Sequence, residues 1–548
     1  MKKGLIWATA GVVLAGCGGG SDGGNANAPV ASQPAPAPVT TPAPPTAPPA
    51  PPAPAVSVTS AAITRQIAAN TGIVMEVTVK PNFTPAGTLY ASAADNATLL
   101  APGVAVTPNS DGTYTLAMAT LPAVESGNYS GEFTIKLCSD EACTTPQAVP
   151  SVKVPYALAV SAAGAAWPGD KPTPLAPWTD VPDWTGFQGN AGHTGYVPVT
   201  LNADQFALRW KIGSVNPQRT STVQTSPATL SATGGLFYTA RDNKLQARRE
   251  TDGSVAWTYD FSTLAYPAVN PTTVEGGVVY MAAGQQPGYL FGLDAVTGGV
   301  RIKAPVNFQN DAIAPVAFNG TVYSDTGTYS GVQAISANGD ILYRAGSGQG
   351  ISGTPAVDDA SLYVYANNSL YVYDRKTGVQ RSRIDEVGGQ TSYGAIGGAP
   401  VLGAKGTVFA ASYSAASWGG ANALLKFNVE KGYIDWRMSG AYAVTPAYAD
   451  GIVYAVNKSP YRLEARAESD GALRWSWTPP VAGETLWNAE PIVTKNMVFV
   501  STDMNTYAID LRTHRPVWSY PLSGRLALTR SGILYIHANE ALVAVSVK

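Results

Sequence analysis

Short runs of β-branched and aromatic residues, separated by turn residues, occupy most of the chain after residue 56. From residue 227 onward these runs recur in units that each open on a proline, at positions 227, 267, 315, 355, 400, 446 and 491. Each unit continues with a triplet such as Leu236-Phe237-Tyr238, a composition typical of strands and not of helices. Strand-forming repeats of about 45 residues predict the blades of a β-propeller.

Most units also contain a polar turn, as in Asp294-Ala295-Val296-Thr297-Gly298. The aspartate can accept hydrogen bonds from the backbone two residues on, and the glycine supplies the positive φ of a tight hairpin. In four units a tryptophan stands four residues after the glycine position. We expect these tryptophans on the outer strands, docked between neighbouring blades: they are Trp257, Trp436, Trp475 and Trp518.

The last unit begins near Leu526 and reaches the end of the sequence without an outer strand. The segment of residues 206–212, which contains Trp210, matches such a strand but has no earlier unit to belong to. We therefore expect the two segments to complete one blade, which would close the ring and leave no free edge. The sequence predicts an all-β fold with an eight-bladed propeller over residues 184–548.

A smaller β-domain is predicted for residues 56–160, because seven short strand-like runs separated by turns are typical of an immunoglobulin-like sandwich. Cys138 and Cys143 flank a predicted hairpin tip, where facing strand ends bring Cβ atoms within disulfide reach. The alternative, half of a metal site, has no second cysteine pair, and the three histidines are far away in sequence. Residues 138–143 and the following strand resemble a hairpin of bacterial cell-surface immunoglobulin-like modules. Residues 161–183, rich in proline, indicate a linker.

The charge of the chain narrows the possible functions. Lys and Arg number 35, Asp and Glu number 37, and charged residues make up 13% of the sequence, against roughly 25% in an average soluble domain. A net charge of −2 excludes nucleic-acid binding driven by basic charge.

The first residues look like a bacterial lipoprotein signal. Lys2 and Lys3 precede an apolar stretch, residues 5–14, that is too short to span a bilayer, and Leu14-Ala15-Gly16-Cys17 follows as a lipobox. The resemblance implies removal of residues 1–16 and acylation of Cys17, which would anchor the chain in a membrane. An ordinary secretory signal is the alternative. Gly18 after the cysteine favours the outer membrane, with the body in the periplasm or at the cell surface.

Residues 17–55 predict a tether, first rich in Gly and Ser and then in Pro and Ala. Such proline-rich sequence favours an extended polyproline II conformation.

The Asp-x-x-Thr-Gly-x-x-x-Trp pattern, together with the opening Trp184-Thr185-Gly186-Phe187-Gln188-Gly189-Asn190, resembles a known repeat. This is the pyrroloquinoline-quinone-type (PQQ-like) repeat shared by quinoprotein dehydrogenases and BamB-type outer-membrane assembly lipoproteins. The resemblance covers residues 184–548. It implies either a quinone enzyme or a platform that binds other envelope proteins.

For a quinoprotein dehydrogenase, the resemblance implies a vicinal disulfide, a stacking tryptophan, a catalytic Asp, and a Ca²⁺ ion held by Glu, Asn and Asp. Residues 184–548 contain no cysteine. Near the expected channel, the positions before the unit prolines supply one carboxylate, which makes a poor Ca²⁺ cage: they are Ser226, Tyr266, Ala314, Thr354, Ala399, Thr445 and Glu490. Asn488 and Glu490 indicate a remnant site or a polar loop. We therefore expect no catalytic, metal or cofactor-binding residues, and PQQ and Ca²⁺ are disfavoured.

Other catalytic motifs are weak. Residues 348–353 match G-x-G-x-x-G, but Pro355 and a strand follow, so no helix N-terminus is available to hold a phosphate. The histidines, His193, His514 and His537, are widely separated and do not predict a zinc site.

The leading hypothesis is an interaction platform for other cell-envelope proteins of unknown identity, with the outer-membrane assembly role that the resemblance implies. Loops longer than the minimal repeat carry the candidate contact residues, since exposed aromatics are good interface anchors; packing within each loop is the alternative. These residues are Trp418, Tyr393, Ile396 and Trp487. The competing hypotheses are a PQQ-dependent dehydrogenase with a degenerate site and a surface adhesin or glycan-binding lipoprotein.

Overall fold

The computed structural model describes much of the chain after residue 52. The described residues are 53–548 except residues 60–61, 69–71, 86, 122–123, 125, 162–173, 214–229, 242, 265–269, 285–287, 307–313, 326–330, 347–353, 367, 387–398, 413–422, 443, 480–483, 486–488 and 539–540. The signal, Cys17 and most of the tether lie outside these ranges. Their assignment stays a prediction, as do the domain boundaries drawn from the sequence.

Eight strands form the first β unit. They pair in the order β1-β3-β6-β5-β4-β7-β8-β2, and every pair is antiparallel except β2 with β8. The strands are β1 (Val56–Val58), β2 (Ile63–Ala68), β3 (Gly72–Pro81), β4 (Tyr90–Ala94), β5 (Leu100–Pro108), β6 (Tyr114–Thr120), β7 (Gly127–Cys138) and β8 (Val152–Ser161).

The core of this unit follows from the alternation of its strands. Met75, Val77 and Val79 are two residues apart along β3 and are all fully buried, because successive side chains of a strand point to opposite faces. They belong to the same apolar cluster as Phe133, whose ring stacks on that of Tyr156 with centroids 4.1 Å apart. The immunoglobulin-like type of the unit stays a prediction.

Cys138 and Cys143 are joined by a disulfide, with their Cα atoms 5.1 Å apart. The connection follows the end of β7, where the Asp140 carboxylate accepts hydrogen bonds from the backbone amides of Thr144 (2.9 Å) and Thr145 (2.6 Å). These bonds hold the turn that brings the two cysteines together.

The remaining strands build the propeller, in antiparallel sets of four. The sets are β10 (Ser231–Thr233), β11 (Leu236–Arg241), β12 (Lys244–Arg249) and β13 (Val255–Asp260); β14 (Thr273–Glu275), β15 (Val278–Ala283), β16 (Gly288–Asp294) and β17 (Val300–Val306); β18 (Val316–Phe318), β19 (Thr321–Asp325), β20 (Val332–Ser336) and β21 (Ile341–Ala345); β22 (Ala356–Val357), β23 (Ser361–Ala366), β24 (Ser369–Asp374) and β25 (Gln380–Asp385); β26 (Val401–Leu402), β27 (Thr407–Ser412), β28 (Ala423–Asn428) and β29 (Tyr433–Ser439); β30 (Ala447–Ala449), β31 (Ile452–Lys458), β32 (Tyr461–Ala467) and β33 (Leu473–Trp477); β34 (Ile492–Val493), β35 (Met497–Ser501), β36 (Thr506–Asp510) and β37 (Pro516–Tyr520); and β38 (Arg525–Thr529), β39 (Ile533–His537), β40 (Ala541–Ser546) and β9 (Ala207–Gly213).

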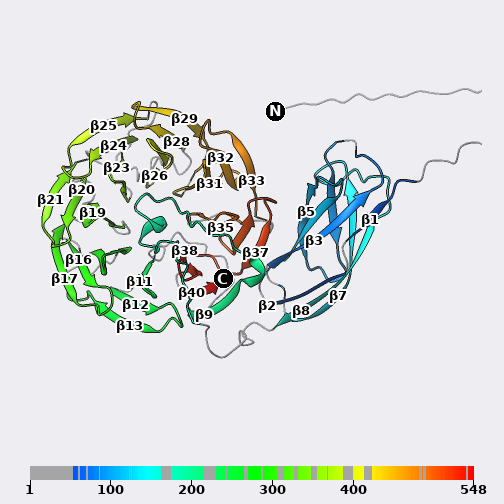
Figure 1. Cartoon of the computed structure of the whole chain (residues 1–548), viewed down its shortest axis with the longest axis horizontal. Coiled ribbons are helices and arrows are strands. Elements are labelled where there is room, and N and C mark those ends of the chain that lie inside the picture. The colour runs from blue at the N-terminus through cyan, green and yellow to red at the C-terminus, as the bar shows by residue number, and fades with distance from the viewer. Residues whose placement is uncertain are drawn as a thin grey trace, which may run out of the picture. The chain divides into compact units, whose positions relative to one another are not determined.

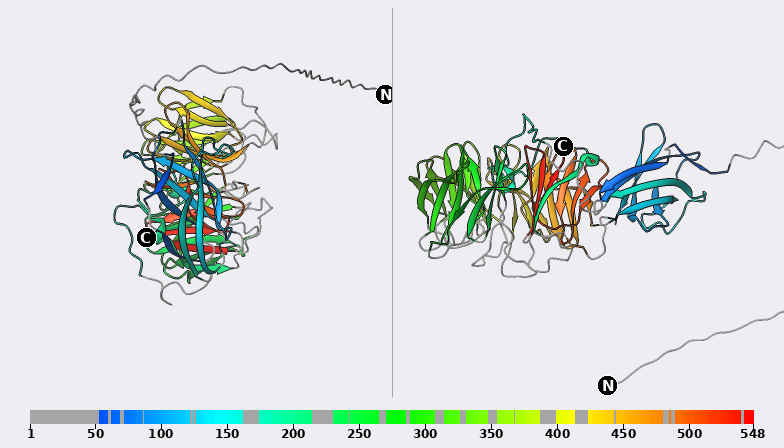
Figure 2. Two further views of the ribbon diagram at one scale, coloured as in Figure 1. Left: turned by 90° about the vertical axis from the view of Figure 1, so that its right-hand side faces the viewer. Right: turned by 90° about the horizontal axis from the view of Figure 1, so that it is seen from below.

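The sets surround a common centre, as Figure 1 shows, and Figure 2 shows the same sets from the side. The fourth strand of each set, such as β13, β17 or β21, lies on the rim of the ring. Two short 3₁₀ turns, η1 (Phe187–Gly189) and η2 (Ala203–Gln205), precede the blades. Among the described residues, no helix is long and apolar enough to cross a membrane.

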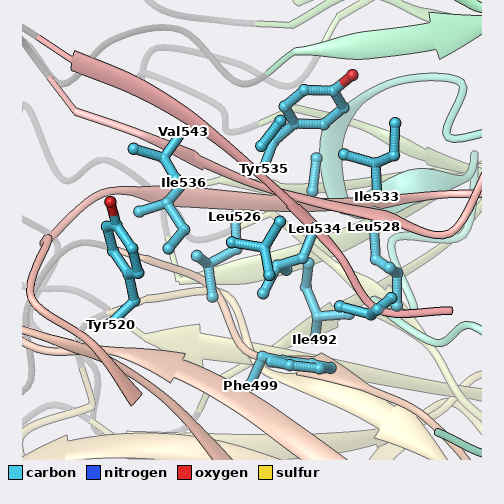
Figure 3. Close-up of a cluster of buried hydrophobic side chains, with 14 of the residues drawn as sticks. Ile492, Phe499, Tyr520, Leu526, Leu528, Ile533, Leu534, Tyr535, Ile536 and Val543 are labelled. Carbon is cyan, nitrogen blue, oxygen red and sulfur yellow. The ribbon is translucent and has the colours of Figure 1, made fainter. Parts of the chain in front are cut away.

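The terminal strands close the ring together, as the orphan strand in the sequence predicted. β9 pairs antiparallel with β40, placing Trp210 opposite Ala544 and Lys211 opposite Val543. The apolar residues of this region form a shared core in which Leu528, Ile533, Leu534 and Tyr535 are at most 1% exposed (Figure 3). The chain thus links residues more than 300 positions apart in one sheet.

The expected count of eight blades is corrected by the sheet topology. Seven of the sets are separate four-stranded sheets, so the propeller has seven separate blades. The strands β34 to β37 belong instead to a twelve-stranded sheet, because β3 pairs with the outer edge of β37, Gly72 opposite Ser519 and Ile73 opposite Trp518. The sequence repeats count units of four strands and contain no signal for this additional edge pairing.

Candidate functional site

Residues 184–199, which we call the central segment, run through the inside of the ring, where Figure 1 draws them in blue-green. Their carbonyls accept hydrogen bonds of 2.7–2.9 Å from the innermost strands of six sets. The carbonyl and amide partners are Trp184 and Ala232, Thr185 and Val274, Ala191 and Val357, Gly192 and Leu402, Thr194 and Tyr448, and Gly195 and Val493. The central segment therefore satisfies backbone groups at the inner edges of these sheets.

Two side chains fix the central segment from within. Gln188 and His193 both have positive φ, 52° and 56°, a conformation that non-glycine residues rarely adopt. The Gln188 amide donates to the carbonyl oxygens of Thr445 (3.4 Å) and Pro446 (3.2 Å). These long-range bonds offset the cost of the local conformation.

His193 is fully buried, and its Nδ1 lies 2.9 Å from the Pro400 carbonyl oxygen. Because a carbonyl can only accept, Nδ1 carries the proton, and the buried Nε2 has no hydrogen-bond partner among the described residues. Burial lowers the pKa of His193 to about 4, so the ring is neutral at pH 7. The imidazole of His193 and the ring of Phe187 are nearly perpendicular, with their centroids 5.1 Å apart.

The one carboxylate that the sequence placed near the channel is engaged in an ion pair. Both carboxylate oxygens of Glu490 accept from Nη1 of Arg525, at 2.8 and 2.9 Å. Ala314, Thr354 and Ala399 are buried, while Asn488 lies outside the described residues. Within the described ranges, no three or more His, Cys, Asp or Glu side chains gather in a way that could hold a metal ion.

The fully buried carboxylate of Glu464 is neutralised by its own sheet. Arg462 (2.6 Å), Arg466 (2.7 Å), Asn457 (3.1 Å) and the Tyr442 hydroxyl (2.7 Å) all donate to it. Burial raises the pKa of Glu464, but these hydrogen bonds outweigh it and the pKa is lowered overall. This arrangement stabilises the blade and leaves the carboxylate no free lone pair directed at a substrate.

The predicted tryptophans stand at the junctions between successive sets. Trp257 shows the pattern: its ring lies against the turn glycine of the next blade, Gly298, so closely that a Cβ there would come within 2.7 Å of the ring. Its indole Nε1 donates to the Ala295 carbonyl at 3.0 Å. We call this combination of turn glycine and carbonyl a tryptophan dock.

Two further tryptophans occupy docks of the same kind. Trp210 covers Gly253 and donates to the Glu250 carbonyl at 3.0 Å. Trp436 lies over Gly471 and donates to the carbonyl of Glu468 at 2.9 Å.

The last two predicted tryptophans have modified partners. Trp475 stacks on the imidazole of His514, which replaces the turn glycine, with ring centroids 4.6 Å apart. Trp518 is 4% exposed and meets the edge of the Phe206 ring at 5.6 Å. Each predicted tryptophan thus contacts residues of the adjoining set.

Three junctions have another residue at the tryptophan position: Ile302, Tyr343 and Ser382. Tyr343 still uses its dock, since its hydroxyl donates to the Arg375 carbonyl at 2.6 Å. The sequence shows which units lack the tryptophan. It does not show how the loss changes the surface at each junction.

The candidate interaction residues Trp418, Tyr393, Ile396 and Trp487 lie outside the described residues. Their role stays a prediction, as does the lipidation of Cys17. The G-x-G-x-x-G match at residues 348–353 also falls outside the described ranges. His537 is buried in β39, and the His514 ring stacks on that of Trp475.

Comparison with solved structures finds matches at low sequence identity. BamB from Moraxella catarrhalis is 16% identical, with a TM-score of 0.48, and the match covers 60% of this chain and 99% of that chain. The computationally designed Ika8 protein is 14% identical, with a TM-score of 0.48 and coverage of 62% and 100%. The Pan2 WD40 domain of Neurospora crassa is 8% identical, with a TM-score of 0.37 and coverage of 64% and 98%. The comparison with curated proteins found no match.

The comparison with protein families gives a more specific result. The family described as outer membrane protein assembly factor BamB matches residues 195–378 and 328–548, which together span more than half of the chain. The matched residues include every dock described above, whereas residues 184–194 of the central segment lie outside the match. By this match over its propeller repeats, the chain belongs to the BamB family of PQQ-repeat proteins.

Proposed function

We propose that the protein is a non-enzymatic interaction platform of the bacterial cell envelope that holds other envelope proteins during outer-membrane protein assembly. The observation that carries this proposal is the family match over residues 195–378 and 328–548. We further propose that acylated Cys17 anchors the chain in the outer membrane, with residues 17–55 as the tether. The partners are other envelope proteins, and membrane contact is through the lipid.

The geometry of the ring supports a scaffold. The central segment bonds to six innermost strands, and the tryptophan docks join successive blades along the ring. A frame held by buried bonds at its centre and by aromatic side chains at its junctions can present surface loops in fixed positions.

The residues present do not fit a PQQ and Ca²⁺ centre. Residues 184–548 contain no cysteine for the vicinal disulfide. Glu490, the candidate Ca²⁺ ligand, has both oxygens bonded to Arg525. We derive no catalytic step through such a centre.

Photocrosslinking in intact cells tests the proposed platform. A photoreactive phenylalanine analogue would be placed at the exposed turn residues Val296 (72% exposed) and Val379 (64% exposed), and at Trp418. Val545 (1% exposed) is the matched control, because a buried position cannot reach a partner. We expect adducts with outer-membrane assembly proteins from at least one exposed site and none from Val545. Absence of adducts at all three sites would overturn the proposal.

A cofactor titration separates the platform from the alternative enzyme. We expect purified protein to show no saturable binding of pyrroloquinoline quinone in the presence of Ca²⁺, because the donor set is incomplete. Fluorescence or calorimetric titration measures this directly. Saturable binding accompanied by reduction of an electron-acceptor dye would establish the dehydrogenase instead.

A further inference from the structure

The junction between the sets β14–β17 and β18–β21 differs from its neighbours. By position in the repeat, the dock consists of the Ala337 carbonyl and the turn glycine Gly339, and the residue directed at it is Ile302 instead of tryptophan. Ile302 approaches Gly339, where a Cβ would come within 2.9 Å of its methyl carbon. An isoleucine fills less volume than an indole and has no N–H to donate.

A cleft of about 530 Å³ lies at this junction. Its lining includes Ile302, Val278, Tyr280, Ala337 and Asn338. We call it the Ile302 cleft. Ala337 is exposed, whereas the corresponding Ala295 and Glu250 at occupied docks are 3% and 2% exposed. Replacement of the tryptophan thus coincides with an exposed Ala337, while Ile302 covers Gly339.

The hydrogen-bonding groups of the Ile302 cleft lack the partners found one blade earlier. There, the Ala295 carbonyl accepts from both the Trp257 indole (3.0 Å) and the Tyr238 hydroxyl (3.0 Å). Tyr280 is the counterpart of Tyr238, but no described residue is hydrogen-bonded to its hydroxyl or donates to the Ala337 carbonyl. The cleft therefore offers an acceptor at the place where an indole N–H is bound in the neighbouring dock.

The charged groups of the cleft are already satisfied. The two Glu275 oxygens accept from the backbone amides of Asn319 (2.7 Å) and Gly320 (3.0 Å). Arg301 pairs with Asp294. A ligand that enters the cleft consequently needs no charge of its own, and a neutral aromatic group with one N–H donor is complementary to the lining.

Exposed apolar side chains belong to the strands and turn beside the cleft. Val300 (46% exposed) begins β17, and Ile341 (41%) and Leu342 (51%) begin β21. Val296 (72%) lies in the turn before β17. Such residues supply apolar area around a buried anchor, the arrangement found at protein–protein hot spots, where tryptophan is enriched.

A second junction without tryptophan lacks these features. Ser382 occupies the position there, but the Tyr363 hydroxyl donates to Asp358 at 2.8 Å. Val429, the counterpart of Ala337, packs against the apolar cluster that contains Ile384. Loss of the tryptophan alone therefore does not define an open dock.

We propose that the Ile302 cleft binds a tryptophan side chain presented by a partner protein, with the indole N–H donating to the Ala337 carbonyl. The ring then lies beside Ile302, which itself covers Gly339 as Trp257 covers Gly298 one junction earlier. This inference rests on the proposed platform function and names the side-chain chemistry of its partner.

Titration with N-acetyl-L-tryptophanamide tests the proposal on the full chain, observed by NMR of isoleucine methyl groups. We expect saturable shifts of the Ile302 and Ile341 methyls with a dissociation constant of about 1 mM, as befits a single small fragment. N-acetyl-L-leucinamide, which lacks the indole, should give no saturable shift. A wild-type protein that shows no saturable shift with the tryptophan probe would overturn the proposal.

Two variants locate the site. Ile302→Trp restores the repeat residue, so a folded variant should bind the probe at least about tenfold more weakly, a change read from Ile341. Asn338→Arg places a larger side chain in the cleft lining from an exposed turn position, and it should weaken binding of the probe by a similar factor. This variant provides the test if Ile302→Trp does not fold. Unchanged affinity in either folded variant would contradict the assignment.

Trp257→Ile provides a control, because it recreates the same substitution one junction earlier. The Tyr238 hydroxyl still donates to the Ala295 carbonyl there, so we expect no second binding event in this variant and an unchanged first one. A second binding event in a folded variant would show that an isoleucine at this position suffices to open a dock, against the requirement for a carbonyl without a partner. If Val379 gives partner adducts but the cleft does not bind the probe, the proposed platform function stands. The cleft is then not the site that anchors the partner.

Discussion

At the scale of single residues, the chain uses buried polar side chains to hold its centre. Gln188 bridges the central segment to the Thr445 and Pro446 carbonyls, just before β30, and His193 bridges it to the Pro400 carbonyl, just before β26. These bonds could not be predicted from the sequence, because the partners are more than 200 positions apart. A glycine-rich run containing an isolated histidine was the available signal, and it does not indicate which residues His193 and Gln188 contact.

The depressed pKa of His193 makes stability depend on pH. The pKa falls from 6.5 to about 4 on folding, so the folded state binds this proton less readily than the unfolded state. The stabilisation is fully present above pH 6.5 and is lost as the pH falls from 6.5 toward 4. Lowering the pH from 7 to 5 should cost about 2 kcal/mol through this group.

Urea unfolding of wild type and His193→Asn at both pH values measures the effect. Asparagine tolerates positive φ and keeps an amide donor for the Pro400 carbonyl, but it does not titrate. The variant should lose about 2 kcal/mol less than wild type over this pH interval. An equal loss in both proteins would show that His193 is not the titrating group.

At the scale of elements, the repeat pattern predicted the strands well because each strand combines a local turn signal with β-branched and aromatic residues. The triplet Leu236-Phe237-Tyr238 lies in β11, and the turn Asp294-Ala295-Val296-Thr297-Gly298 joins β16 to β17. The edge pairing of β3 with β37 was not predictable, since backbone pairing at an open edge imposes little side-chain pattern.

The tryptophan docks should contribute strongly to stability. Trp436 is 8% exposed and makes a hydrogen bond to the next blade, so Trp436→Ala should destabilise the protein by about 3–5 kcal/mol. Tyr433→Ala on the same strand is the control; Tyr433 is 47% exposed, and its loss should change stability by no more than about 0.5 kcal/mol. Equal effects of the two substitutions in chemical denaturation would refute the docking role.

Closure by β9 gives a further expectation at this scale. A chain that begins at residue 214 lacks β9 and leaves β40 with an unpaired edge. It should melt at a lower temperature than the full chain and aggregate more readily, because an exposed sheet edge can pair with other chains. Calorimetry and light scattering read out both effects. A melting temperature equal to that of the full chain would argue against closure as a source of stability.

At the scale of the whole molecule, the all-β propeller and its family could be read from the repeat, whereas the number of separate blades could not. The repeat identifies four-stranded units, but the joining of one unit to the first β unit depends on tertiary contacts between distant residues. The candidate contact residues show the same limit. Long loops and exposed aromatics indicated Trp418 and Trp487, while the Ile302 cleft arises from a missing tryptophan and the shape of the junction around it.

The platform function is the central claim at this scale, and co-purification from detergent-solubilised membranes tests it most directly. Affinity-tagged full-length protein expressed at its native level would be compared, by quantitative mass spectrometry, with an untagged strain. We predict that outer-membrane assembly proteins are enriched with the tagged chain. Recovery of the tagged chain from native membranes with no envelope protein above the untagged background would contradict the account.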